Sequence, residues 1–375
     1  MTQPRNLTKS EETIVSDLRR LFKQYGYRQY KMSKFEEYDL YVENKSFLVS
    51  DNVITFTDLD GHLRALKPDV TLSIAKNASV DVSTAQKLYY HENVYRAERG
   101  SHEYREIMQI GLESIGNIDL YATGEAVMLA ARSLEIISQE YLLDMSHMGF
   151  TTAILEEAEL SSTQQAELLE ALSAKNVSGI RECCSRFGVS ENFTERLAAL
   201  AALYGPAFTI LPKLKALSPN HQADEAVAEL EAVCQMLDAA GCGERINLDF
   251  SIVNDMSYYN SIIFQGYIEG IPTPALSGGR YDNLLKKFGK EAGAVGYAIY
   301  LSALESLAPR RSPYDVDALL IYSPDTAPAK LAAAVKALTD EGLSLQVQQA
   351  VPQGLRYRKL LKLEEGGPVT LEEND

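Results

Sequence analysis

The chain has 375 residues and a formal net charge of −16, with 46% hydrophobic and 23% charged residues. This length is comfortable for two domains, and the composition is ordinary for a globular protein. The acidic charge disfavours non-specific binding to nucleic acid, whose phosphates are neutralised by Lys and Arg. It leaves protein partners open, and it does not exclude a local basic groove.

Neither the apolar runs nor the cysteines indicate a membrane or an oxidising compartment. No apolar run reaches the roughly 18 residues that a membrane-spanning helix needs, and the polar N-terminus lacks the apolar core of a signal peptide. The four cysteines form no CxxC pair, and the five histidines are scattered without metal-ligand spacing. We therefore expect a cytoplasmic protein with reduced thiols, no cofactor and no metal site.

Helical spacing of apolar residues opens the readable part of the chain. Residues 10–26 predict a helix with Ser10 as its N-cap and Gly26 as its end. A strand-like stretch follows near 27–35. Residues 52–76 predict a hairpin, because Asp60-Gly61 between two apolar runs is a strong turn signal.

The middle of the chain alternates between strand and helix signals. Residues 86–116 predict two strands joined by a polar loop, and an Ala-, Leu- and Met-rich helix follows at about 121–140. Residues 151–240 are dominated by Ala, Leu and Glu at helical spacing, which indicates a helical insertion. Strand signals return at 246–268, before the glycine pair at 278–279.

The end of the chain predicts a second, smaller domain. Residues 308–313 are typical of a linker, and a β-α-β unit follows it. The last dozen residues are expected to be frayed. Antiparallel hairpins backed by helices favour an α+β core over 1–308, with a small C-terminal domain over 313–375.

Four segments carry the chemistry, whereas no Walker A loop, dinucleotide fingerprint or nucleophile elbow is present. In chain order they are Leu66–Thr71, Tyr95–Arg99 with Tyr104–Glu113, Tyr258–Asn260 with Phe264, and Ser277–Leu284. In this order and at this spacing, across roughly 1–308, they resemble histidyl-tRNA synthetase, a class II synthetase. The resemblance implies an antiparallel sheet flanked by helices.

The resemblance also implies a histidine-binding pocket. Arg96 takes the place of an arginine that grips the α-phosphate and the amino-acid carboxylate, and a guanidinium fork suits either anion. Asp69 and Thr71 match positions that hold the α-amino group, while Gln109 and Glu113 match positions that line the pocket. The expected walls are Tyr258, Tyr259, Gly278 and Gly279.

Two departures from the synthetase pattern affect the expected activity. Asn254 stands where the synthetase has a catalytic arginine, and Ala303 replaces the arginine that contacts the ATP triphosphate. Adenylation moves negative charge at the α-phosphate, and losing one fixed donor costs on the order of 10²–10³ in rate. Losing both cations should abolish useful activation of histidine. We therefore expect no aminoacylation activity.

Two further features depart from the synthetase. Ser33 occupies a position where motif 1, the dimer element, usually carries a proline, although a class II homodimer is still expected. The C-terminal unit resembles a truncated anticodon-binding domain. Its basic residues, Arg356, Arg358, Lys359 and Lys362, fit one solvated helix face, so tRNA is not an expected partner.

A synthetase-like chain that keeps an amino-acid pocket and loses its ATP grip is suited to sensing. Most of the sequence resembles the regulatory subunit of short-form ATP phosphoribosyltransferase, in histidine biosynthesis. That resemblance implies a hetero-oligomer with a catalytic subunit, which the regulatory subunit activates, and a part in feedback inhibition by histidine. Two alternatives stay open: a divergent histidyl-tRNA synthetase or paralogue that acylates another acceptor, and a regulator that binds uncharged tRNA.

Overall fold

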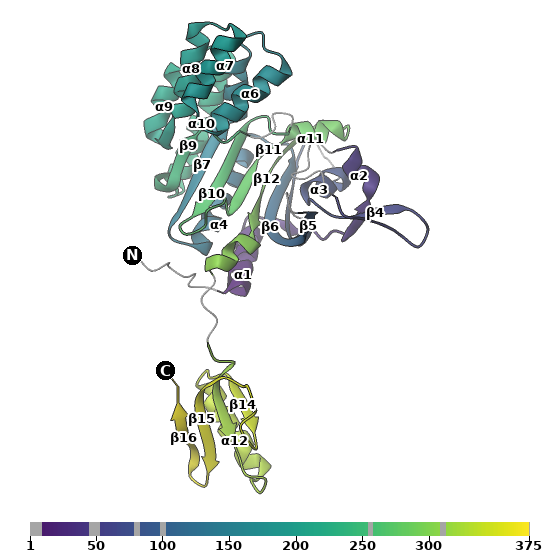
Figure 1. Ribbon diagram of the computed structural model, residues 1–375, viewed down its shortest axis with the longest axis vertical. Helices are drawn as coiled ribbons and strands as arrows, with labels where there is room; N and C mark the ends of the chain where they lie inside the picture. The colour runs from purple at the N-terminus through teal and green to yellow at the C-terminus, as the bar shows by residue number, and fades with distance from the viewer. Residues whose placement is uncertain are drawn as a thin grey trace. The chain divides into compact units, whose positions relative to one another are not determined.

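The computed structural model describes residues 10–44, 53–78, 83–97, 103–253, 258–307 and 313–374. Contacts divide the chain into two units, Met1–Leu307 and Ala308–Asp375. The first unit is built on a nine-stranded sheet in the order β1-β5-β6-β12-β11-β10-β7-β9-β8 (Figure 1). The strands are β1 (Arg28–Gln29), β5 (Ala85–Ala97), β6 (Tyr104–Gly116), β7 (Tyr141–His147), β8 (Tyr204–Pro206), β9 (Ile246–Asp249), β10 (Ile262–Ile268), β11 (Leu276–Arg280) and β12 (Gly293–Tyr300).

Two helices cover one face of this sheet. The apolar helix α4 (Leu120–Ile137) lies in contact with β6, β7, β10, β11 and β12, and α1 (Glu11–Gln24) packs against it. The N-cap of α4 is Asp119, whose carboxylate accepts the Ala122 backbone N–H at 2.8 Å. Ser10 caps α1 and Gly26 follows its end at a φ of +81°, so the ends predicted for this helix are confirmed.

The region predicted as a helical insertion contains six helices: α5 (Met148–Leu155), α6 (Ser162–Ser173), α7 (Val177–Phe187), α8 (Glu191–Ala202), α9 (Ala207–Ala216) and α10 (His221–Ala239). Local signals start and stop them. Ser161 and Gln164 form a capping box at α6, and Gly188 ends α7 in the left-handed region. Helices α6 to α9 cluster at the β9 end of the sheet, and α10 contacts α4 and α5 (Figure 1).

A three-stranded sheet, β2-β4-β3, lies beside α2 (Tyr38–Val42). It contains β2 (Phe35–Glu37), β3 (Thr55–Thr57) and β4 (Leu63–Leu66). The predicted hairpin, with its turn at Asp60-Gly61, is confirmed as far as Leu66, but the prediction is wrong beyond that residue. The last residues of the predicted hairpin form α3 (Thr71–Asn77), because Asp69 accepts the Leu72 N–H at 2.8 Å and starts a helix after Pro68.

The remaining elements of the first unit connect or close its sheet. They are the 3₁₀ turn η2 (Gly243–Arg245), α11 (Asp282–Lys287) and the 3₁₀ segment η3 (Leu301–Leu307). Strand β7 has no counterpart among the predicted elements. Its alternating Asp144 and Ser146 interrupt the apolar run that would have marked a strand on sequence alone.

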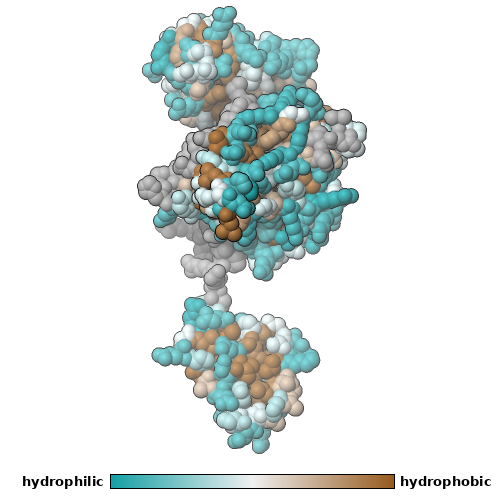
Figure 2. Space-filling model, turned by 90° about the vertical axis from the view of Figure 1, so that its right-hand side faces the viewer, coloured by the Kyte–Doolittle hydropathy of each residue, from teal (hydrophilic) through white to brown (hydrophobic). Residues whose placement is uncertain are grey.

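The C-terminal unit has a four-stranded sheet in the order β14-β13-β15-β16. It consists of β13 (Val316–Ile321), α12 (Pro328–Asp340), β14 (Leu345–Gln348), β15 (Tyr357–Glu364) and β16 (Gly367–Glu373), and it shows broad apolar patches in Figure 2. Two expectations were wrong here. The last residues are not frayed, because Gly366-Gly367 turns the chain into β16, and the basic residues 356–362 lie at and along a strand rather than on a helix.

Candidate functional site

The sheet register places one carboxyl group over a strip of glycine backbone. Glu113 on β6 pairs directly with Gly296 on β12, and Gly296 pairs with Gly279 on β11. Paired residues point to the same face of a sheet. A Cβ atom on Gly296 would lie 1.8 Å from Oε2 of Glu113, so only glycine leaves room for the carboxyl group.

Glu113 is buried and held by two hydroxyl groups. The Thr71 hydroxyl donates to Oε1 at 2.8 Å, and the Tyr281 hydroxyl donates to Oε2. Burial raises the pKa of Glu113 to about 8, with a smaller contribution from the charge of Asp69, although both hydrogen bonds oppose the shift. At neutral pH this carboxyl group therefore carries a proton.

Asp69 lies in the loop before α3, and Arg96 contacts this loop. Burial raises the pKa of Asp69, and the backbone N–H of Leu72 and the charge of Arg96 lower it. Nε of Arg96 donates to the carbonyl oxygen of Pro68 at 2.9 Å, which ties the guanidinium to the loop that carries Asp69. An acidic side chain and a guanidinium are thus attached to the same loop, and Thr71, the first residue of α3 after it, contacts Glu113.

Three tyrosines wall the same region. The rings of Tyr258 and Tyr259 are 4.4 Å apart at 64°, and those of Tyr258 and Tyr281 are 5.6 Å apart. Burial raises the pKa of all three hydroxyl groups, so they stay neutral. A Cβ atom on Gly279 would lie 2.7 Å from the Tyr259 ring, so this glycine lets the ring approach the sheet.

The structure brings together most of the residues predicted for the pocket. We call the group of Asp69, Thr71, Arg96, Glu113, Tyr258, Tyr259 and Tyr281 the Glu113 site. Gln109 is buried on β6, four residues before Glu113. Because side chains alternate along a strand, the two residues point to the same face of the sheet. Gly278 faces the other side, where a Cβ atom would meet Tyr297 and Phe264.

One of the two positions predicted to have lost a cation lies among the described residues. Ala303 is half-buried in η3 and packs against the main core, where its methyl group carries no charge. Asn254 lies outside the described residues. Sequence reasoning gave no role to Tyr281, although one of the four segments contains it, or to Gly296. The structure shows that both residues meet Glu113.

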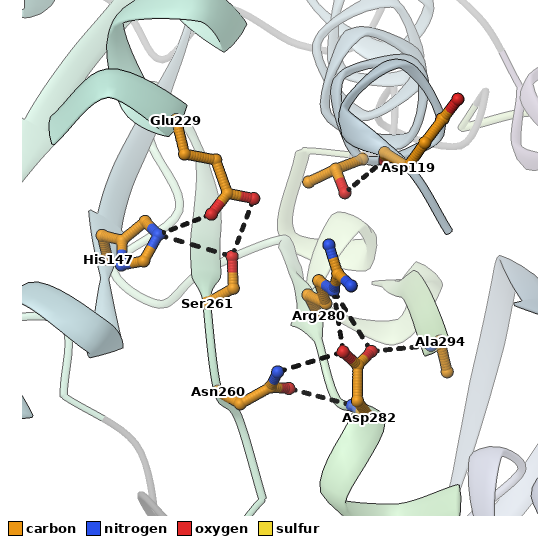
Figure 3. Close-up of polar contacts among 9 residues, drawn as sticks. Asp119, His147, Glu229, Asn260, Ser261, Arg280, Asp282 and Ala294 are labelled. Carbon is orange, nitrogen blue, oxygen red and sulfur yellow. Dashed lines mark hydrogen bonds and ion pairs between the residues drawn. The ribbon is translucent and has the colours of Figure 1, made fainter. Parts of the chain in front are cut away.

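A polar network, drawn in Figure 3, involves residues that adjoin Tyr259 and Tyr281 in the chain. The Asp282 carboxylate accepts from Asn260 Nδ2 at 3.1 Å, Arg280 Nε at 3.0 Å and the Ala294 N–H at 2.9 Å. One residue beyond Asn260, the Ser261 hydroxyl donates to Oε1 of Glu229 at 3.0 Å. Oε2 of Glu229 lies 2.9 Å from His147 Nε2. We call this set the Glu229 network.

A second buried acidic group lies under the insertion, on the face that carries Glu113. Asp144 on β7 is buried beside Asn247 and Asp249 of β9. The Lys175 ammonium donates to Asp249 at 2.8 Å and lies 4.4 Å from the centre of the Tyr204 ring. Burial, and then the charge of Asp249, raise the pKa of Asp144 to about 6. We call these five residues the Asp144 cluster.

Asp58, Asp60 and His62 are close enough to share a metal ion, at the tip of the β3–β4 hairpin. Asp58 already accepts from the Asp60 and His62 N–H groups and from Arg64, so we assign no metal to it. Among the described residues, no helix combines the length and the apolar character needed to cross a bilayer.

Comparison with known proteins shows which family the chain resembles. A family model described as histidyl-tRNA synthetase matches residues 3–304. The chain is 32% identical over 308 residues to the ATP phosphoribosyltransferase regulatory subunit of Caldanaerobacter subterraneus subsp. tengcongensis, which covers 80% of this chain and 79% of the relative.

Solved structures share the fold. A protein of Bacillus halodurans described as an ATP phosphoribosyltransferase regulatory subunit/histidyl-tRNA synthetase superposes with a TM-score of 0.74 and 24% identity, over 93% of this chain and 92% of that one. An ATP phosphoribosyl transferase (HisG:HisZ) complex from Thermotoga maritima gives 0.62 and 15%, over 78% and 98%. The predicted class II synthetase-like α+β fold is confirmed. The chain belongs to the histidyl-tRNA synthetase-like family of ATP phosphoribosyltransferase regulatory subunits.

Proposed function

We propose that this chain is a non-catalytic regulatory subunit that joins the catalytic subunit of ATP phosphoribosyltransferase in the cytosol and binds histidine at the Glu113 site. The observation that carries the proposal is a buried group of polar residues that matches the amino-acid pocket of the related synthetases, with an alanine where those enzymes contact ATP through an arginine. Arg96, Asp69 and Glu113 lie together, while Ala303 supplies no charge where the related synthetases carry an arginine.

Each part of histidine has a partner of suitable chemistry at this site. Arg96 suits the carboxylate as a guanidinium fork, and Asp69 with Thr71 and Gln109 suits the ammonium group. Glu113 and Tyr259 face the imidazole. Because Glu113 holds a proton at neutral pH, it can donate to an unprotonated ring nitrogen or give up that proton when an imidazolium binds.

Calorimetry with histidine tests the site. Glu113→Ala is expected to abolish binding, because it removes the group that Thr71 and Tyr281 orient. Glu106→Ala is the matched control, since Glu106 lies on the same strand and is exposed. Equal affinity of Glu113→Ala and the unmodified chain would remove histidine from this site.

Reconstitution tests the role. The catalytic subunit is expected to co-purify with this chain in a fixed ratio, to gain phosphoribosyltransferase activity from it, and to lose that activity when histidine is added. The change in affinity between active and inhibited states is typically about 1–3 kcal/mol. Histidine-dependent ATP–pyrophosphate exchange is expected to be absent; its presence would restore the synthetase alternative.

We also propose a homodimer through α1. The outer face of α1 lines a groove of about 820 Å³ with His91 and Met108 on its floor. Glu11 and Glu12 lie at one end of this face, and Arg19, Arg20 and Lys23 lie towards the other. An antiparallel second copy would therefore pair opposite charges.

Sedimentation tests this interface. Arg20→Glu is expected to lower the dimer fraction, and Glu12→Arg in the same chain should restore it by exchanging the charges. A dimer that is indifferent to both changes would be held by another surface.

A further inference from the structure

An acidic residue of the helical insertion contacts the chain segment that follows Tyr258 and Tyr259 of the Glu113 site. Glu229 lies on α10, and its two carboxylate oxygens contact His147 at the end of β7 and Ser261 at the start of β10 (Figure 3). Burial would raise the pKa of Glu229, but its hydrogen bond with His147 and the charge of that ring hold it below its usual range. Glu229 is therefore ionised at neutral pH.

The segment that Glu229 holds also forms a wall of the Glu113 site. Tyr258 and Tyr259 precede Asn260, whose side-chain amide exchanges two hydrogen bonds with Asp282. Asp282 follows Tyr281, the residue that donates to Glu113. Two backbone hydrogen bonds fix the same segment. The Asn260 N–H donates to the carbonyl oxygen of Arg280 at 3.2 Å, and the Met148 N–H donates to the carbonyl oxygen of Ser261 at 2.9 Å.

The geometry excludes a hydrolytic reading of the serine, histidine and glutamate. A nucleophile and an acid must meet different nitrogens of the histidine ring. Here Ser261 and Glu229 both approach Nε2, at 3.4 Å and 2.9 Å, while Nδ1 is buried without a hydrogen-bond partner among the described residues. These contacts hold a backbone segment in place and provide no route for a proton.

We propose that Glu229 is a positioning residue of the Glu113 site, which couples the helical insertion to histidine binding. This inference rests on the proposed function, because it takes histidine as the ligand. A charge-assisted hydrogen bond is about twice as strong as a neutral one, and it depends on direction. Movement of α10 would therefore shift Ser261 and the adjoining Tyr258–Asn260 wall. Coupling of this kind is reciprocal, so histidine should also steady α10.

Histidine affinity of three α10 variants tests the proposal. Glu229→Ala is expected to weaken binding about tenfold, within the range of remote coupling. Glu229→Gln keeps the shape and an acceptor for Ser261 but loses the charge, so its affinity should lie between those of Glu229→Ala and the unmodified chain. Glu231→Ala is the matched control: it removes an exposed glutamate two residues along the same helix and should leave the affinity unchanged.

A double-mutant cycle and hydrogen exchange separate positioning from general destabilisation. If Glu229 acts through Ser261, adding Ser261→Ala to Glu229→Ala should weaken binding little further. Histidine should slow amide exchange in α10 of the unmodified chain and leave that of Glu229→Ala unchanged.

Two results would overturn the inference, and they are distinguishable. If the unmodified chain binds histidine and Glu229→Ala binds it equally well, Glu229 does not position the site, although the proposed function stands. If the unmodified chain and Glu113→Ala both give no heat with histidine, the proposed ligand is wrong and the inference falls with it.

Discussion

One face of the nine-stranded sheet carries buried carboxyl groups at two places, and their neighbours are of opposite kinds. Glu113 lies between two hydroxyl groups over a glycine strip, and its pKa rises to about 8. Asp144 lies beside a second acid and a lysine from the insertion, and its pKa rises to about 6. Among the described residues, Oδ1 of Asp144 has no hydrogen-bond partner.

We interpret the difference as that between the proposed ligand site and a packing contact of the insertion. Glu113 is surrounded by groups that can change partners: hydroxyl groups, a guanidinium and aromatic rings. The Asp249 carboxylate accepts a hydrogen bond from the Lys175 ammonium, which also lies over the Tyr204 ring and completes the Asp144 cluster. The first arrangement can pass a proton to a bound imidazole, whereas the second fixes the insertion to β9.

The largest effect is expected at Gly296. Gly296→Ala should displace the Glu113 carboxyl group, abolish histidine binding and destabilise the fold by about 2–3 kcal/mol through overpacking. Denaturant unfolding and calorimetry measure both effects. Gly366→Ala is the control, since a Cβ atom there would meet nothing within 4 Å. Retained histidine binding in Gly296→Ala would show that the glycine strip does not define the site.

The next effect is a pH dependence at Glu113. Its pKa is raised from 4.5 to about 8, so between these values the folded chain holds a proton that the unfolded chain has lost. Stability should therefore fall as pH rises through this window, by up to about 1.4 kcal/mol per pH unit. Glu113→Gln, which cannot ionise, should lose this slope. If the free energy of unfolding, measured with urea, varied with pH in the same way for both chains, the Glu113 carboxyl group would be ionised across this range.

The same test at Asp144 should show a narrower window. Its pKa is raised from 3.8 to about 6, so its contribution to stability should be lost as pH rises through that range and should stay constant above it. Asp144→Asn should remove this dependence and leave the slope at higher pH intact. If the stability difference between Asp144→Asn and the unmodified chain still changed with pH up to pH 8, Asp144 rather than Glu113 would be the group with the higher pKa.

The smallest effect is expected at Lys175. Lys175→Met should destabilise the fold by about 1 kcal/mol at neutral pH, because the ammonium is partly exposed but its partner Asp249 is buried. It should also raise the pKa of Asp144, since the lysine charge lowers it. Lys336→Met, which breaks an exposed pair with Asp340, is the control and should change stability less.

Local signals in the sequence predicted the elements that depend on near neighbours. Ser10 and Gly26 mark the two ends of α1, and Asp60-Gly61 forms the turn of the β3–β4 hairpin. These features could be predicted because a helix cap or a turn depends on residues close in the chain. The same reasoning failed at β7, where Asp144 and Ser146 break the apolar run, and at β16, whose pairing with β15 outweighs a polar composition.

The candidate site was predicted by resemblance, and its internal geometry required the structure. The contact between Glu113 and Gly296 depends on the register of two strands far apart in the chain. The contact between Glu229 and Ser261 depends on where α10 docks, which no spacing in the sequence encodes. Residue types could identify the chemistry of Arg96 and Glu113, but they could not show which groups orient them.

The pairing of β6 with β12 has a consequence for synthesis of the chain. Strand β6 ends at Gly116, and its partner β12 begins at Gly293, after the whole insertion. The growing chain must therefore leave one edge of a 13-residue strand unpaired until late, and such edges invite aggregation. We expect ribosome-bound chains that stop before Gly293 to need a chaperone, as co-sedimentation would show. The Glu113 site, which we propose binds histidine, would then be among the last features of the protein to form.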